Sequence, residues 1–239
     1  MSVMALIGIL ACDHVSPELA DAARGRDYDD MYTEMLQAAE PSIRTRTYDV
    51  VNGELPSHPD ECDAWIITGA RYDAYRDEPW IVALRKFVSS VHEHRARLVG
   101  VCFGHQVVAH ALGGKAENTG TWKAGPQVLK VEDTPWFEGA SVAINAMHQD
   151  VASAVPPGGR TIAAGDTAEH PMFLVDDNIL CVQDHPEYDP AYIAGLVEAR
   201  RPRMGDAIAD AALERIDTDA VDNHVVGRWI TDFLLDRRR

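Results

Sequence analysis

The 239-residue sequence lacks the features of nucleic-acid-binding and membrane-spanning proteins. Positive charge is scarce, because 22 Lys and Arg stand against 38 Asp and Glu, which gives a formal net charge of −16. A surface this negative repels a phosphate backbone, so no nucleic acid is expected as a partner. No apolar run approaches the ~20 residues that a membrane-spanning helix needs. The apolar N-terminus has no basic leader or cleavage site, so we expect neither a membrane partner nor a signal peptide.

Cysteine is also sparse, and its placement excludes two further classes of protein. The four cysteines are scattered and form no Cys-x-x-Cys pair. This spacing is typical neither of a disulfide scaffold nor of a zinc site, so we expect no metal and a cytoplasmic location. The sequence also contains no Gly-rich phosphate loop or dinucleotide fingerprint, and we therefore expect no cofactor.

The apolar pattern predicts an α/β protein with a mixed, mostly parallel central sheet flanked by helices. In the first half of the chain, apolar runs typical of buried strands alternate with helical patterns. These predicted strands cover 4–12, 43–51, 64–68 and 97–102, and the helices cover 28–39, 79–91 and 104–112. Shorter strands then follow one another closely, so part of the sheet is predicted to be antiparallel. They cover 127–132, 141–147, 161–164, 172–175 and 179–183.

No linker divides the sequence, so we predict a single domain over residues 1–239. Its core covers about 4–190, and a C-terminal helical extension covers about 190–239. The last helix carries apolar residues at intervals of four, which predicts one buried face.

A cysteine at the end of a predicted buried strand indicates catalytic chemistry. Cys102 stands between this strand and a helix, with Gly100 two positions before it and Gly104 two positions after it. A nucleophile at such a sharp turn has a strained backbone, and its neighbours must lack side chains to avoid clashes. The helix N-terminus stabilises a thiolate and offers free N–H groups to an oxyanion. The alternative is a buried structural cysteine, which is the usual role of a lone cysteine.

A candidate base for this thiol lies further along the chain. His185 follows a predicted strand and precedes Glu187 by two residues, so on an extended segment both side chains point the same way. Pro186 between them favours that extended conformation. Glu187 can then hold the imidazole tautomer while the other ring nitrogen takes the thiol proton. Taken alone, the same tripeptide is also typical of a plain turn at a strand end.

These two motifs together resemble those of the class I glutamine amidotransferases. The resemblance rests on Gly-Val-Cys-Phe-Gly-His-Gln at 100–106 and His-Pro-Glu at 185–187, and it covers about residues 4–190. It implies a flavodoxin-like fold and hydrolysis of the γ-amide of glutamine through a γ-glutamyl thioester. The catalytic triad that it implies consists of Cys102, His185 and Glu187.

Further stretches agree with this resemblance and imply the rest of the site. Residues 65–69 are similar to the strand and loop that supply an oxyanion-hole N–H, 118–125 to the loop after the nucleophile helix, and 147–150 to the substrate-side His-x-Asp element. The oxyanion-hole and substrate-binding residues implied in this way are Gly69, Ala70, Phe103, Gln106, His148 and Asp150. Many members have glycine or serine where Ala70 and Arg71 stand, so the donor stays open within 69–71. Asp150 could instead only cap a turn.

Three functions follow from the resemblance. The first is hydrolysis of glutamine to glutamate and ammonia, with a separate synthetase subunit as the possible acceptor, because the residues after Glu187 suffice for only two or three helices. The second is cleavage of γ-glutamyl peptides or conjugates. Residues 66–81 look closer to a stand-alone, GMP-synthase-like branch that includes the γ-glutamyl peptidases, and we expect the loop 71–76 on the leaving-group side. The third is a non-catalytic regulatory or binding relative.

Overall fold

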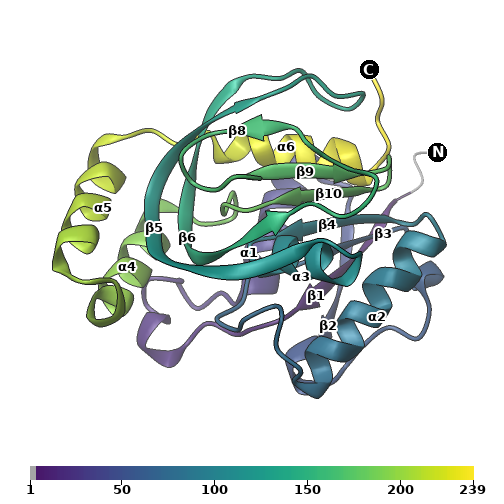
Figure 1. Cartoon of the computed structure of the whole chain (residues 1–239), viewed down its shortest axis with the longest axis horizontal. Helices are drawn as coiled ribbons and strands as arrows, with labels where there is room; N and C mark the ends of the chain where they lie inside the picture. Colours follow the sequence, from purple (N-terminus) through teal and green to yellow (C-terminus); the bar gives the residue numbers. More distant parts are fainter. Residues whose placement is uncertain (1–3) are drawn as a thin grey trace.

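The apolar runs of the first half of the chain form parallel strands that are buried on both faces. The computed structural model describes residues 4–239 and builds them around a seven-stranded sheet with the order β2-β1-β3-β4-β10-β9-β7 (Figure 1). The first five strands in this order are parallel to one another, whereas β9 is antiparallel to both of its neighbours, β10 and β7. The bounds are β1 (Leu6–Ala11), β2 (Arg44–Asp49), β3 (Ala64–Ile67), β4 (Arg97–Val101), β7 (Gly159–Thr161), β9 (Met172–Val175) and β10 (Ile179–Val182).

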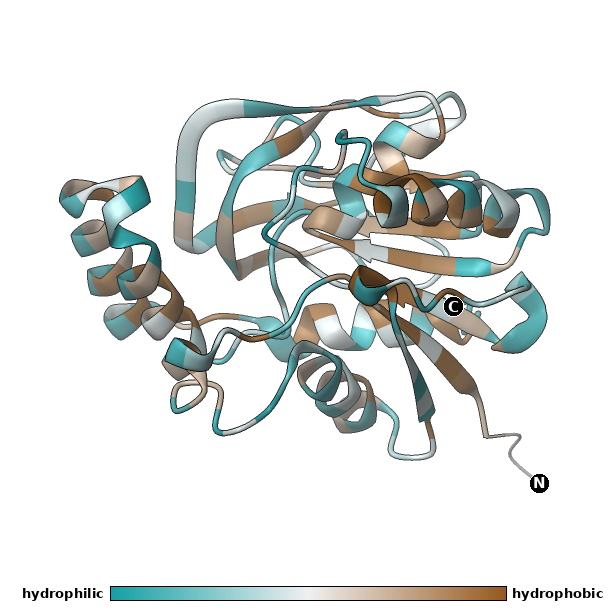
Figure 2. Cartoon of the chain, turned by 90° about the horizontal axis from the view of Figure 1, so that it is seen from below, coloured by the Kyte–Doolittle hydropathy of each residue, from teal (hydrophilic) through white to brown (hydrophobic). Residues whose placement is uncertain are grey.

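Helices cover both faces of this sheet, because alternate strand residues point to opposite sides. Ile7 and Ile9 of β1 pack with α1 (Tyr28–Ala39) and α6 (Asn223–Leu234) on one face. Leu10 packs on the other face with side chains of helices α2 and α3. These two helices are α2 (Pro79–Glu93) and α3 (Phe103–Ala111). Figure 2 shows the central strands largely in the brown of apolar residues, between helices that alternate brown and teal. The predicted α/β class with a mostly parallel sheet is confirmed.

The middle of the chain forms a long hairpin that the sequence pattern did not predict. β5 (Lys115–Val131) pairs with β6 (Ser141–Ala154) and with β8 (Ala163–Ala164) in a second, three-stranded sheet. The predicted strands at 127–132 and 141–147 are therefore too short, the loop expected at 118–125 is wrong, and residues 147–150 lie within β6. The largely polar and exposed residues between Asn118 and Lys123 lack the apolar pattern by which a strand is predicted. A register shift also interrupts the strand pairing there. The strand expected over 161–164 is also divided between the two sheets.

Three helices follow Glu187 in the described residues, where the sequence predicted two or three. α4 (Pro190–Met204) and α5 (Asp206–Thr218) pack against one another beside the long hairpin, and α6 returns to the central sheet. Figure 1 shows α4 and α5 at one end of the molecule and α6 beside β9 and β10. Three short 3₁₀ helices complete the fold, namely η1 (Pro17–Leu19), η2 (Val50–Asn52) and η3 (Pro59–Glu61). None of the helices within residues 4–239 has the length and apolar character needed to cross a membrane.

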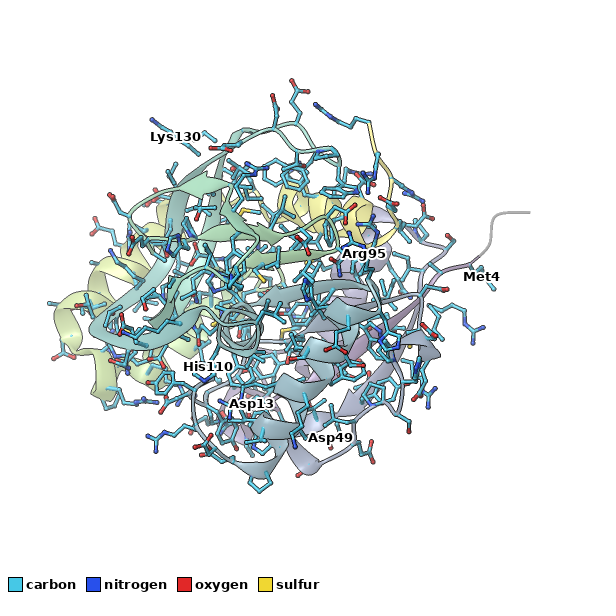
Figure 3. The ribbon with its side chains drawn as sticks, turned by 45° about the vertical axis from the view of Figure 1, so that its right-hand side comes forward. Met4, Asp13, Asp49, Arg95, His110 and Lys130 are labelled. Carbon is cyan, nitrogen blue, oxygen red and sulfur yellow. The ribbon has the colours of Figure 1, made fainter. Side chains whose placement is uncertain are left out.

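The parallel strands share one edge, where their carboxyl ends meet. β1 lies between β2 and β3, so the strand order reverses next to it, which is where α/β proteins bind ligands. Figure 3 shows Asp13 and Asp49, which stand at the carboxyl ends of β1 and β2, close to one edge, with Met4 and Arg95 away from it. The segments that follow β3, β4 and β10 hold the predicted triad and the predicted oxyanion donors, Gln106 lies in α3, and His148 and Asp150 lie in β6.

Candidate active site

Cys102 lies at a strained turn between β4 and α3. Its φ is 51° and its ψ −103°, an uncommon conformation for a residue with a side chain. Its amide donates a 2.9 Å hydrogen bond to the carbonyl of Val182 in the neighbouring strand, which anchors the turn. A Cβ on Gly100 would lie 2.6 Å from the carbonyl carbon of Gly104, and one on Gly104 would lie 2.6 Å from the carbonyl oxygen of Ile67. The turn therefore requires both glycines, for the steric reason that the sequence suggested.

His185 and Glu187 form a buried pair beside this turn. The amide of His185 donates to the carbonyl of Asn145 at 2.8 Å, which fixes the backbone after β10. Its Nδ1 lies 2.7 Å from Oε1 of Glu187, and the same oxygen accepts a 2.8 Å hydrogen bond from the hydroxyl of Tyr32. The ring of Tyr188 stacks on the imidazole at 4.1 Å with an interplanar angle of 7°. These contacts leave Nε2 as the nitrogen available for proton transfer.

The surroundings of His185 favour its charged form. Burial opposes an imidazolium, but the Glu187 carboxylate, followed by the Cys102 thiol, outweighs burial and raises the pKa of His185 to about 10. The thiol and the imidazole line the same pocket. Gly69 lies against the same ring, since a Cβ there would be 2.7 Å from Cε1 of His185. A side chain at that position would displace the imidazole.

The backbone N–H groups of residues 69, 70 and 71 are the candidate oxyanion donors on this loop, and one of them is already bound within the protein. The Arg71 amide donates to Oδ2 of Asp13 at 2.9 Å, and its guanidinium contacts the same carboxylate. Ala70 lines the same pocket as Cys102, and Phe103 is the first residue of α3. The first amides of a helix have no intrahelical acceptor, so the Phe103 N–H is available to a ligand.

Gln106 and Asp150 lie together on one wall of the pocket. Nε2 of Gln106 donates to the backbone carbonyl of Asp150 at 2.8 Å, which leaves its Oε1 as an acceptor. Oδ1 of Asp150 accepts from the amide of Asn118, but its buried Oδ2 has no partner within residues 4–239. Burial, followed by the nearby Asp73 carboxylate, raises the pKa of Asp150. Asp150 lies within β6 and does not cap a turn; the side chains of Asn118 and Tyr75 interact with its carboxylate, and its second oxygen is an acceptor suited to a cation.

His148 lines the same pocket but is held by other residues. Its Nε2 lies 3.0 Å from the Thr167 hydroxyl and 3.3 Å from Oδ1 of Asp184, which is fully buried and precedes His185. Thr167 in turn donates to the same Asp184 oxygen at 2.9 Å. The Nε2 atom of His148 is therefore held by Thr167 and by Asp184, the residue before the histidine of the predicted triad. Within residues 4–239, no group of three or more His, Cys, Asp or Glu side chains is arranged to hold a metal ion.

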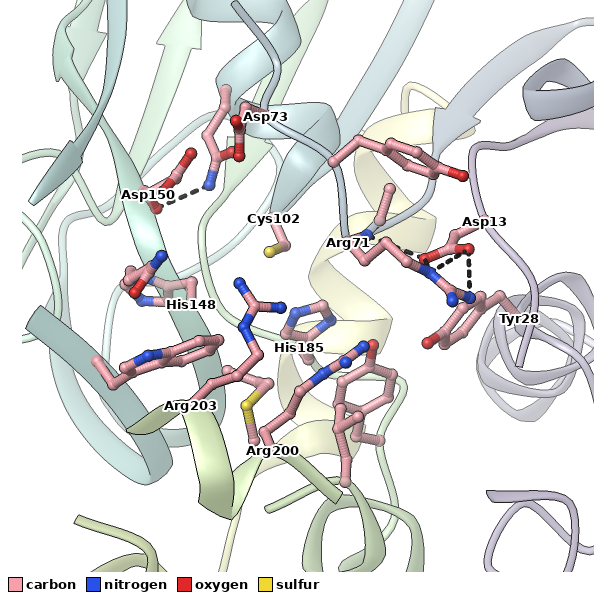
Figure 4. Close-up of a pocket in the computed structure, with 18 residues that line it drawn as sticks. Asp13, Tyr28, Arg71, Asp73, Cys102, His148, Asp150, His185, Arg200 and Arg203 are labelled. Atoms are coloured by element: carbon pink, nitrogen blue, oxygen red, sulfur yellow. Dashed lines mark hydrogen bonds and ion pairs between the residues drawn. The ribbon is translucent and has the colours of Figure 1, made fainter. Parts of the chain in front are cut away.

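The pocket holds about 690 Å³ of empty space, its open mouth included. It brings together Cys102, His185, Gln106, His148 and Asp150, whereas the Glu187 carboxylate supports the pocket from behind His185. Figure 4 shows that side chains from distant segments also point into it. Those that lie outside the stretches the sequence singled out are Asp13, Tyr28, Tyr188, Leu196, Arg200 and Arg203.

Comparison with known proteins identifies the family of this chain. The model of the family "Glutamine amidotransferase class-I" matches residues 27–192, which include the Cys102 turn and the His185–Glu187 pair. The chain belongs to the class I glutamine amidotransferases.

Individual relatives and solved structures agree with this family. A glutamine amidotransferase-like protein of Schizosaccharomyces pombe is 32% identical over 248 residues, which cover 96% of this chain and 98% of the relative. Gamma-glutamyl peptidase 2 of Arabidopsis thaliana is 28% identical over 79% of this chain and 81% of its own length. The crystal structure of a glutamine amidotransferase from Thermotoga maritima has a TM-score of 0.70 at 19% identity, with 97% of each chain covered, and supports the fold.

Proposed function

We propose that this protein is a cysteine hydrolase that cleaves the amide bond of a γ-glutamyl group through a thioester. The observation that carries the proposal is the meeting, in one pocket, of the strained Cys102 with a histidine that is oriented by a buried glutamate. A nucleophile, its base and the group that orients the base are the three parts that covalent acyl transfer needs. The names of several relatives, glutamine amidotransferase-like protein and gamma-glutamyl peptidase, support the γ-glutamyl substrate.

The first half of the reaction forms the thioester. Nε2 of His185 takes the thiol proton, and the Cys102 sulfur attacks the δ-carbonyl carbon of the substrate. The N–H groups of Ala70 and Phe103 stabilise the resulting oxyanion. The C–N bond breaks as His185 gives its proton to the departing nitrogen, so ammonia or an amine leaves and a γ-glutamyl thioester remains. The carboxylate of Glu187 stabilises the imidazolium that forms between these steps.

The second half of the reaction releases glutamate. Water attacks the thioester carbon while His185 takes one of its protons. The C–S bond then breaks, the sulfur regains its proton from His185, and glutamate leaves. Gln106 and Asp150 bind the α-ammonium of the glutamyl unit in this scheme, because Asp150 offers a buried oxygen that has no partner within the described residues. With glutamine as substrate the ammonia can serve a separate synthetase subunit.

The decisive experiment is glutamate release from glutamine and from γ-glutamyl dipeptides by the purified protein. Cys102→Ser should keep the fold and lose activity by a factor of about a thousand or more. Thiol alkylation should label Cys102, which lines the pocket, faster than Cys12 and Cys181, whose pKa values burial raises. Release of no glutamate from any γ-glutamyl substrate would favour a non-catalytic binding relative and refute the proposal.

A further inference from the structure

Two arginines of α4 reach the mouth of the pocket without an acidic partner. Arg200 and Arg203 both line it, and residues three apart on a helix lie on one face. Neither guanidinium has an ion pair or a side-chain hydrogen bond within residues 4–239; Arg203 lies only over the ring of Trp122, at 5.5 Å. Arg201 between them has the opposite environment, since it pairs with Glu198, Asp206 and Asp210 outside the pocket.

This arrangement is unusual in a chain with a net charge of −16. Acidic residues outnumber basic ones and are available to most arginines; Arg71, the third arginine of the pocket, is neutralised by Asp13. Two guanidinium groups on one helix face repel one another, and no carboxylate compensates them. An anionic group of a ligand would relieve this repulsion and satisfy donors that are now open to solvent.

The two arginines and the carboxylate of Asp150 lie on different sides of the Cys102 sulfur. Figure 4 shows Asp150 on one side of the Cys102 sulfur, and Arg203 and Arg200 on the side of His185. The α-ammonium of the glutamyl unit belongs at Asp150 under the function proposed above. The leaving group must lie next to His185, because that residue delivers its proton to the departing nitrogen.

We infer that Arg200 and Arg203 bind a carboxylate on the leaving group. The preferred substrates are then γ-glutamyl peptides, whose leaving group is an amino acid or peptide with a free carboxylate, and glutamine is a poorer substrate because ammonia offers these arginines nothing to bind. This inference rests on the proposed function and adds to it the class of substrate. It also replaces the loop 71–76 as the main leaving-group contact, since Arg71 is already bound by Asp13 and Asp73 lies near Asp150.

The test compares two substrates that differ only in the charge of the leaving group, γ-glutamyl-alanine and γ-glutamyl-alaninamide. The wild-type protein should show a kcat/KM at least about tenfold higher for γ-glutamyl-alanine, as expected for charge-assisted hydrogen bonds to a carboxylate. Arg200→Gln and Arg203→Gln should each lose most of this preference and keep the kcat/KM for γ-glutamyl-alaninamide. Arg201→Gln is the matched control on the same helix and should keep the full preference.

A charge reversal separates recognition from a structural role. Arg203→Glu should raise kcat/KM for γ-glutamyl-putrescine, whose leaving group carries an ammonium, while that for γ-glutamyl-alanine falls. Two results would overturn the inference and leave the proposed hydrolase intact. One is an unchanged preference for γ-glutamyl-alanine in both Arg200→Gln and Arg203→Gln, and the other is an equal loss of kcat/KM for every substrate in these variants. A wild-type protein that releases no glutamate from any of these compounds would instead overturn the proposed function, and this inference with it.

Discussion

Removing the hydroxyl of Tyr32 should weaken the proposed catalytic pair, His185 and Glu187, without changing the lining of the pocket. This side chain is fully buried in α1 and donates a 2.8 Å hydrogen bond to Oε1 of Glu187, the oxygen that also contacts Nδ1 of His185. The other oxygen of Glu187 is buried and has no partner within residues 4–239. A hydrogen bond to a charged group contributes about 1.5–3 kcal/mol, so we expect Tyr32→Phe to lower the free energy of unfolding by about that amount.

The same change should slow the reaction. Glu187 keeps its contact with His185 but loses the donor that fixes its orientation, so the imidazole is held less well for proton transfer. We expect kcat to fall by about three- to tenfold, which corresponds to roughly 0.7–1.4 kcal/mol of transition-state stabilisation. KM should stay unchanged, because Tyr32 does not line the pocket. Glutamate release under saturating substrate measures kcat, and thermal or urea unfolding measures stability.

Tyr192→Phe is the matched control for this prediction. Tyr192 is also fully buried, but its hydroxyl donates to the neutral hydroxyl of Tyr28 at 2.9 Å. Its removal should cost only about 1 kcal/mol of stability and leave kcat unchanged. If Tyr32→Phe destabilises the protein no more than Tyr192→Phe and keeps kcat within twofold of wild type, Tyr32 does not position the catalytic pair, and the reasoning is wrong.

Three further predictions follow from the same contacts. Glu187→Gln should slow hydrolysis less than His185→Ala, and the double variant should be little worse than His185→Ala alone; multiplied effects would place Glu187 outside the triad. Gly104→Ala should lower both the Tm and activity, because its Cβ would lie 2.6 Å from a backbone oxygen; wild-type behaviour would contradict this. Burial lowers the pKa of His105 to about 3, so between pH ~6.5 and 3 only the unfolded state binds its proton, and stability falls as pH falls. In urea titrations, His105→Gln should remove this component, up to about 1.4 kcal/mol per pH unit, and an unchanged slope would argue against it.

The sequence by itself determined the features that depend on near neighbours in the chain. The apolar runs predicted β1, β3 and β4 because a parallel strand is buried on both faces and so reads as a continuous apolar segment. The glycines beside Cys102 marked the sharp turn because their constraint is local and steric. The spacing of His185 and Glu187 predicted that their side chains lie on the same side of the segment, because side-chain direction in an extended backbone repeats every two residues. These periodicities are properties of a short segment and need no tertiary information.

Only the tertiary structure decided which distant residues complete the pocket. The long hairpin of β5 and β6 is held by backbone pairing, which polar side chains between Asn118 and Lys123 do not reveal. Tyr32 has the pattern of a helix core residue, and its contact with Glu187 joins positions 155 apart in the sequence. Arg200 and Arg203 follow the ordinary pattern of a surface helix, and nothing near them in the chain marks them as part of the pocket. Their place in the pocket that His185 also lines arises because α4 packs against the hairpin, a contact set by the folded chain as a whole.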